Sequence, residues 1–152
     1  MKHTALGLMM ATVTGMLLIL GVGAATARGG FSMHSLKGGY ASTFSGKLNI
    51  GGGTLVPIMG TGLFIADGHG HLTGHETYTV DTTVCDASIS GSYTIDPDGT
   101  GTDSITFTPP ASETNCQGGS YTQSLAIAEN RKLVLLSNTN GDQIDEQWHR
   151  QR

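Results

Sequence analysis

The sequence predicts an all-β protein, an antiparallel up-and-down barrel of about eight strands that follows a secretory signal peptide. Three observations lead to this prediction. Apolar and polar residues alternate along most of the chain after residue 38, and turn residues recur at intervals of about ten residues. An apolar run near the N-terminus ends in a cluster of small residues. No part of residues 28–152 has the periodicity of a helix.

Residues 1–27 have the features of a signal peptide. A short positive start at Lys2 precedes an apolar run over residues 5–22, and Ala25-Thr26-Ala27 supplies the small-x-small pattern that signal peptidases accept. We expect cleavage between Ala27 and Arg28, with an uncleaved membrane anchor as the alternative. The predicted location is therefore secreted or periplasmic.

The segment that remains, residues 28–152, has the length of a single domain. Removal of Lys2 from the 8 basic residues leaves 7, against 12 acidic residues, so the net charge of this domain is −5. Because no basic cluster is present, we expect no nucleic-acid partner. No second apolar stretch is long enough to cross a bilayer, and we expect no membrane span after cleavage. The pattern leaves the oligomeric state open.

The strands are expected where alternation is unbroken. Their predicted ranges are 39–47, 62–66, 71–80, 84–95, 101–108, 120–128, 132–137 and 143–150. Asp- and Gly-rich turns at 67–70 and 96–99 join neighbouring strands into hairpins, and the prolines at 109–110 end a strand because proline donates no ladder hydrogen bond. Consecutive hairpins in this number favour a closed barrel, which leaves no strand edge exposed.

We expect Cys85 and Cys116, the two cysteines of the chain, to form a disulfide. An even number of cysteines in an exported protein favours a disulfide, and no CxxC spacing indicates a metal site. A hairpin that turns near residue 98 brings Cys85 opposite about residue 111, so that Cys116 lies within reach. Two buried free thiols are the alternative.

Alternation assigns every second side chain of a strand to the barrel interior. The expected inner residues are Tyr40, Phe44, Leu72, Gly74, Glu76, Tyr78, Val80, Cys85, Ala87, Ile89, Gly91, Tyr93, Ile95, Asp103, Ile105, Phe107, Tyr121, Gln123, Leu125, Ile127, Ile144, Glu146 and Trp148. This lining is apolar and aromatic, with Glu76, Gln123 and Glu146 as polar exceptions. A carboxylate on an apolar face is costly unless it is hydrogen-bonded, protonated or wet.

Such a lining predicts a pocket for a small ligand inside the barrel. The candidate pocket residues are Glu76, Tyr78, Tyr93, Phe107, Gln123 and Trp148. The alternative is that these side chains lie at frayed strand ends, where the carboxylates reach water.

Other chemistry is weakly indicated. His69, His71 and His75 are close in sequence, but His71 and His75 share the outer face and lie about 13 Å apart along an extended strand. One ion does not bridge that distance, so we expect no metal site. The sequence contains no nucleophile elbow, phosphate loop or dinucleotide motif, and therefore predicts no cofactor and identifies no catalytic residue.

Four segments carry a family resemblance: LKGGYASTFSG at 36–46, GTGLFIADGHGHLTG at 60–74, GSYTI at 91–95 and DGTGT at 98–102. In this order they resemble small exported bacterial proteins of the allene oxide cyclase barrel-like group, which is related in fold to plant allene oxide cyclases and dirigent proteins. The resemblance covers residues 36–148 and implies an eight-stranded antiparallel barrel with an apolar cavity. It implies no activity, because no catalytic motif of the plant cyclases is matched residue by residue.

Three functions agree with these features. We expect a binding module that holds a small apolar molecule inside the barrel. The alternatives are a structural or surface-interaction protein whose barrel is filled by its own side chains, and an isomerase or cyclase-like enzyme with Glu76 as the acid–base group. The volume inside the barrel separates the filled barrel from the other two.

Overall fold

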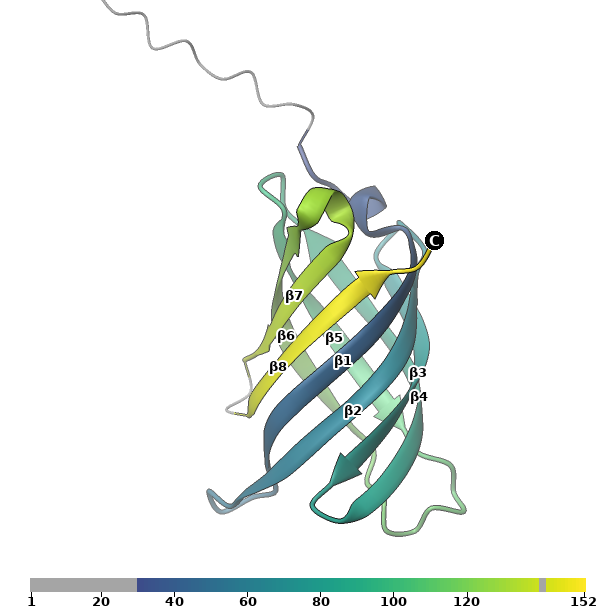
Figure 1. Cartoon of the computed structure of the whole chain (residues 1–152), viewed down its shortest axis with the longest axis vertical. Coiled ribbons are helices and arrows are strands. Elements are labelled where there is room, and N and C mark those ends of the chain that lie inside the picture. Colours follow the sequence, from purple (N-terminus) through teal and green to yellow (C-terminus); the bar gives the residue numbers. More distant parts are fainter. Residues whose placement is uncertain (1–29, 140–141) are drawn as a thin grey trace, which may run out of the picture.

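The computed structural model describes residues 30–139 and 142–152. The predicted signal peptide and its cleavage point at Ala27–Arg28 lie outside these residues. Eight antiparallel strands form one closed barrel, in which consecutive strands are neighbours and the last strand pairs with the first (Figure 1). The predicted up-and-down barrel is therefore confirmed.

The strands are longer on average than the sequence predicts. They are β1 (Gly38–Asn49), β2 (Leu55–Ala66), β3 (His71–Val80), β4 (Thr83–Ile95), β5 (Thr100–Thr108), β6 (Gly119–Ala128), β7 (Leu133–Asn138) and β8 (Gln143–Arg150). The largest difference is in β2, predicted to start at residue 62. Its first part contains Pro57, which pairs with Lys47 of β1. Pro57 lies one residue beyond the last pair of β2 with β3, Ile58–Val80, so its missing N–H interrupts no ladder on that side.

The inner face follows the predicted alternation. Every residue expected in the interior is buried or half-buried, whereas outward residues such as Ser88, Ser90 and Ser92 on β4 are exposed. The barrel interior is therefore lined by the side chains that the period-two pattern selects.

One end of the barrel, which we call the packed end, is filled by side chains. Its buried residues include Tyr40, Phe64, Leu72, Ile105, Val134 and Trp148. A short 3-10 helix, η1 (Met33–Leu36), adds the fully buried Leu36 to this cluster. A second, η2 (Glu129–Arg131), lies at the same end, as does the C-terminus (Figure 1). The sequence prediction of no helix is wrong for these two short segments, which are too short to show a helical period.

Tyr93 fixes η1 over the packed end. Its hydroxyl donates to the carbonyl of Met33 and accepts a hydrogen bond from the backbone N–H of Gly68, each at 3.0 Å. The first contact reaches η1 and the second reaches the β2–β3 turn. One buried phenol therefore holds two segments that close this end of the barrel.

The predicted disulfide is present. Cys85 at the start of β4 is bonded to Cys116, with the Cα atoms 5.8 Å apart. Cys116 belongs to residues 109–118, the segment between β5 and β6. The bond fastens this long loop to the end of the barrel opposite η1. Within residues 30–139 and 142–152, no helix is long and apolar enough to cross a membrane.

Candidate functional site

A cavity of about 620 Å³ occupies the half of the barrel away from η1. We call this half the open end, because the cavity is lined there by residues of three loops: Ile50 between β1 and β2, residues 115–118 between β5 and β6, and Asp142 between β7 and β8. Its apolar wall consists of Phe44, Leu48, Ile58, Tyr78, Val80, Phe107, Tyr121 and Ile144. Cavities of about 300–1,000 Å³ with mostly apolar walls are typical of small-molecule sites.

A glycine of β2 leaves room for one of the rings that line this cavity. Gly60 lies between Phe44 on β1 and Tyr78 on β3 in the strand register. A Cβ atom at Gly60 would lie 2.5 Å from Cζ of Phe44, so any side chain there displaces the ring. The absence of a side chain at Gly60 therefore sets the position of Phe44 in the wall.

Three aromatic rings, from β3, β5 and β6, form a continuous part of the wall. Phe107 lies between Tyr78, at 6.0 Å and 84° to its ring, and Tyr121, at 5.9 Å and 45°. Edge-to-face and tilted pairs of this kind are favourable and restrict ring motion. The wall is therefore aromatic and preformed.

Polar side chains from three strands form the floor of the cavity. Glu76 on β3, Gln123 on β6 and Glu146 on β8 line it and are at most 4% exposed. Glu146 has two donors: its Oε2 accepts from Nε2 of Gln123 at 3.2 Å, and its Oε1 accepts from Nε1 of Trp148 at 2.6 Å. Glu146 is thus a buried carboxyl with both oxygens occupied.

Other polar atoms of the same cavity have no hydrogen-bond partner among the described residues. They are Oε2 of Glu76, Oε1 of Gln123 and the hydroxyl of Tyr78. Buried polar atoms are nearly always hydrogen-bonded, and each one left unpaired in a dry site costs about 1–3 kcal/mol. Three of the seven such atoms in the described interior therefore belong to residues that line this one cavity, and the other four belong to Tyr40, Ser42 and Asp103.

Burial raises the pKa values of the interior carboxyl groups. The pKa of Glu76 rises from 4.5 to about 8, first because burial disfavours the charged form and then because Glu146 lies near. Asp103, buried on β5 opposite Gln123, has a pKa raised from 3.8 to about 8 by the same two causes. The pKa of Glu146 rises only to about 7, because the hydrogen bonds from Trp148 and Gln123 stabilise its carboxylate against burial.

The three groups titrate as one coupled set. A negative charge on Glu146 opposes ionisation of Glu76 and of Asp103. Because burial raises all three pKa values, protonated carboxyl groups persist in the interior toward neutral pH and are able to donate hydrogen bonds.

The structure brings four of the six predicted pocket residues together. Glu76, Tyr78, Phe107 and Gln123 all line the cavity. Tyr93 and Trp148 do not: both belong to the packed cluster, where the Trp148 ring is stacked on Phe64 at 4.7 Å. Alternation along a strand identifies the inward face, but it does not tell how far along the barrel axis an inward residue lies.

Sequence reasoning also missed part of the site. Phe44 and Tyr121 were expected in the interior but not in the pocket, and Ile58 falls in the unpredicted part of β2. Asp103 was placed on the inner face near a turn, yet it is 1% exposed and couples to Glu146. Asp103 pairs with Gln123, and this pairing would have indicated that Asp103 belongs with the floor residues. The pairing is known only once the register of β5 and β6 is known.

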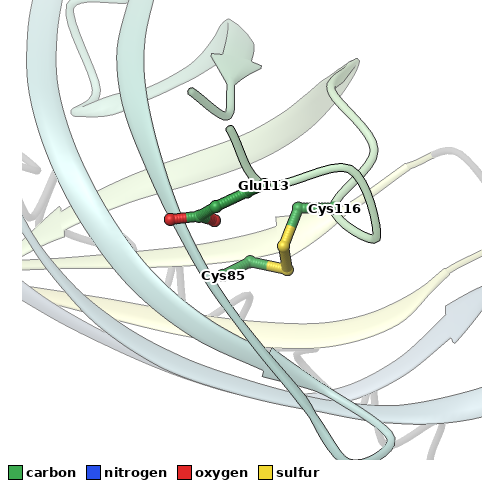
Figure 2. Close-up of side chains that lie close together, drawn as sticks. All are labelled: Cys85, Glu113 and Cys116. Carbon is green, nitrogen blue, oxygen red and sulfur yellow. A yellow bond between two sulfur atoms is a disulfide. The ribbon is translucent and has the colours of Figure 1, made fainter. Parts of the chain in front are cut away.

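One cluster of potential metal ligands occurs among the described residues. It comprises Cys85, Glu113 and Cys116, whose ligand atoms lie within 4.8 Å of one another (Figure 2). Because the two sulfur atoms are bonded to each other, they offer no thiolate to a metal. Glu113 instead accepts a hydrogen bond from the backbone N–H of Asp86 at 3.0 Å. The cluster therefore anchors residues 109–118 to β4 beside the cavity. His71 and His75 are exposed on the outer face of β3.

Comparison with known proteins identified no relative: no family model, curated protein or solved structure matches this chain. The chemistry of the site follows from its own geometry. A preformed aromatic wall favours an apolar molecule, and the unpaired atoms of the floor favour one that also carries a polar group.

Proposed function

We propose that this protein binds a small, mostly apolar molecule in the cavity at the open end of its barrel. The observation that carries the proposal is an apolar cavity of about 620 Å³ whose floor contains buried polar atoms without partners. An apolar ligand body gains from contact with the wall formed by Phe44, Phe107 and Tyr121. A polar group at one end of the ligand satisfies the floor and fixes its orientation.

The alternatives differ from this proposal in what they require of the interior. A structural protein with a filled barrel requires side chains throughout, whereas a cavity of about 620 Å³ lies at the open end, beside a second and smaller cluster of Ile58, Tyr78, Cys85 and Ala87. An isomerase or cyclase-like enzyme would use the same cavity, with Glu76 as the acid, since its pKa of about 8 suits proton transfer near neutral pH. Chemical change in a bound molecule separates the enzyme from the binding protein.

We also propose that the protein acts outside the cytoplasm, secreted or periplasmic. The disulfide supports this location, because such bonds persist in oxidising compartments. The proposal that the chain belongs with the allene oxide cyclase barrel-like group rests on the four sequence segments and on the closed eight-stranded barrel.

Native mass spectrometry of the protein purified from its own source tests the binding proposal. We expect a non-covalent adduct that is lost on denaturation, and a raised melting temperature when the same compound is added to stripped protein. A bare mass, together with no thermal shift across a library of lipids and phenols, would contradict the proposal.

A pair of valines supplies a matched control. Val80 is half-buried and lines the cavity, whereas Val84, across the β3–β4 turn, is 64% exposed on the outer face. Val80→Trp should fill part of the cavity and remove the thermal shift that the added compound causes. Val84→Trp should leave that shift unchanged. Equal shifts in both variants would place the bound molecule outside the barrel.

A further inference from the structure

We infer that the cavity selects an apolar ligand that carries a protonated amine, and that the interior carboxyl groups supply its anionic partner. This inference rests on the proposed function and adds the chemical class of the ligand. It follows from the sign of the interior charges, from the unpaired acceptors on the floor, and from the distances that separate the carboxyl groups.

Apart from the tyrosines, the titratable side chains of the described interior are all carboxylic acids. Glu76, Asp103 and Glu146 project inward from β3, β5 and β8, and Asp142 lines the cavity at its outer edge. No lysine, arginine or histidine lines the cavity, and every such residue in the described part of the chain is exposed. A ligand carboxylate or phosphate would therefore meet carboxyl groups without a compensating cation.

Once Glu76 has lost its proton, the floor offers two unpartnered acceptor oxygens, with the unpartnered hydroxyl of Tyr78 in the same cavity. Oε2 of Glu76 and Oε1 of Gln123 are unpartnered, line the same cavity, and belong to side chains more than nine-tenths buried. The Nε2 group of Gln123 is already used as a donor to Glu146. A primary ammonium has three N–H donors and no acceptor, so it complements this arrangement.

The aromatic wall suits the same ligand. Tyr78, Phe107 and Tyr121 form one connected ring cluster beside Glu76, and an ammonium group is attracted to the faces of such rings. The apolar part of the ligand then contacts the rest of the apolar wall. A single amphiphilic amine therefore contacts both the floor and the wall.

A metal ion fits these acids less well than an organic cation. Glu76, Asp103 and Glu146 do not form a group with oxygens within 4.8 Å of one another; among the described residues only the disulfide cluster reaches that spacing. A metal needs several ligands around one point, whereas an ammonium needs one carboxylate and neighbouring acceptors.

Binding of a cation to a protonated carboxyl group releases that proton. The acid R–COOH of Glu76 becomes a carboxylate paired with the ligand ammonium, and one H⁺ leaves to solvent. The titratable groups that interact with Glu76 are Glu146, Tyr78 and Tyr121, and none of them carries a positive charge. Asp103 interacts with Glu146 and Tyr121 and is also an acid. Affinity for the amine should therefore rise with pH, by at most about tenfold per pH unit, until Glu76 ionises near its pKa of about 8.

Isothermal titration calorimetry with three probes of equal chain length tests the inference on the stripped wild-type protein. The probes are n-octylammonium, n-octanol and n-octanoate. Near neutral pH we expect octylammonium to bind at least about tenfold more tightly than octanol, and octanoate to show no saturable binding. Repetition in buffers of different ionisation enthalpy should show release of close to one proton for octylammonium and none for octanol.

Substitution of Glu76 on the cavity floor provides a second test. Glu76→Gln should bring the affinity for octylammonium down to that for octanol and abolish proton release, while Asp145→Asn, an exposed position next to Glu146, should change neither. Equal binding of octanol and octylammonium by the wild type, or tighter binding of octanoate, overturns the inference and leaves the proposed function intact. Absence of binding by all three probes also overturns it, and the adduct found by native mass spectrometry then decides the proposed function separately.

Discussion

Replacement of Glu76 by glutamine should make the protein more resistant to alkaline pH. Folding places this carboxyl group on the cavity floor and raises its pKa from 4.5 to about 8. The folded state therefore holds the proton more tightly than the unfolded state, and the free energy of unfolding falls as the pH rises. Stability is highest below about pH 4.5, declines through the window up to about pH 8, and is level above it.

The size of the decline follows from the two pKa values. A rise from 4.5 to about 8 corresponds to at most about 5 kcal/mol of unfolding free energy, at about 1.36 kcal/mol for each pH unit. Part of this energy belongs to repulsion by Glu146 and is shared between the two groups. We therefore expect Glu76 alone to account for about 2–5 kcal/mol of the loss between acid and alkaline pH.

Urea unfolding of the oxidised protein at about pH 5, 7 and 9 measures this loss. Glu76→Gln should be close to wild type at the lowest pH and more stable by about 2–5 kcal/mol at the highest. Asp145→Asn is the control, because it removes an exposed carboxyl group beside Glu146 on the same strand. If Glu76→Gln loses as much stability as wild type over this range, Glu76 is ionised and hydrated in the folded protein, and the reasoning about a dry, acidic floor is wrong.

Three further predictions concern the disulfide, Gly60 and the hydrogen bond from Trp148 to Glu146. Replacing both cysteines by serine should lower the free energy of unfolding by about 3–4 kcal/mol, because the disulfide closes a loop of 31 residues; an unchanged urea midpoint would contradict this. Gly60→Val should cost at least about 2 kcal/mol in thermal unfolding by displacing Phe44, whereas Gly39→Val, with no atom within 4 Å of its Cβ, should cost less; equal losses would argue against the close ring contact. The indole N–H resonance of Trp148, the single tryptophan, should titrate with a midpoint near 7, since it donates to Glu146; a flat response would mean that Glu146 keeps one protonation state.

The barrel could be predicted from the sequence because its physical cause is local. Alternation of apolar and polar residues fixes which side chains face inward, and Asp-Gly turns fix where the chain reverses. The same reasoning placed Glu76 and Gln123 inside and joined Cys85 to Cys116. It failed where the cause is not local: Pro57 hid the first part of β2, whose pairing with β1 depends on a strand already in place.

The position of the cavity along the barrel axis was beyond the sequence for a related reason. Tyr93 and Trp148 have the same inward pattern as Tyr78 and Phe107, but they lie near the C-terminal ends of β4 and β8, in the cluster of the packed end that Leu36 of η1 completes. The pairing of Asp103 with Gln123 likewise depends on the register of β5 and β6. Depth and pairing are properties of the closed barrel, and a single strand does not encode them.

Amide and indole chemical-shift mapping with n-octylammonium tests the central claim, an interior site at the open end, most directly. We expect shifts at Gly118, Gly119 and Tyr121 and at the indole of Trp148, which is linked to the floor through Glu146. The turn at 96–99, at the packed end, should be unaffected. Shifts confined to the outer face of β2, where Met59, Leu63 and Ile65 are exposed, would show that apolar molecules bind outside the barrel and would contradict an interior site.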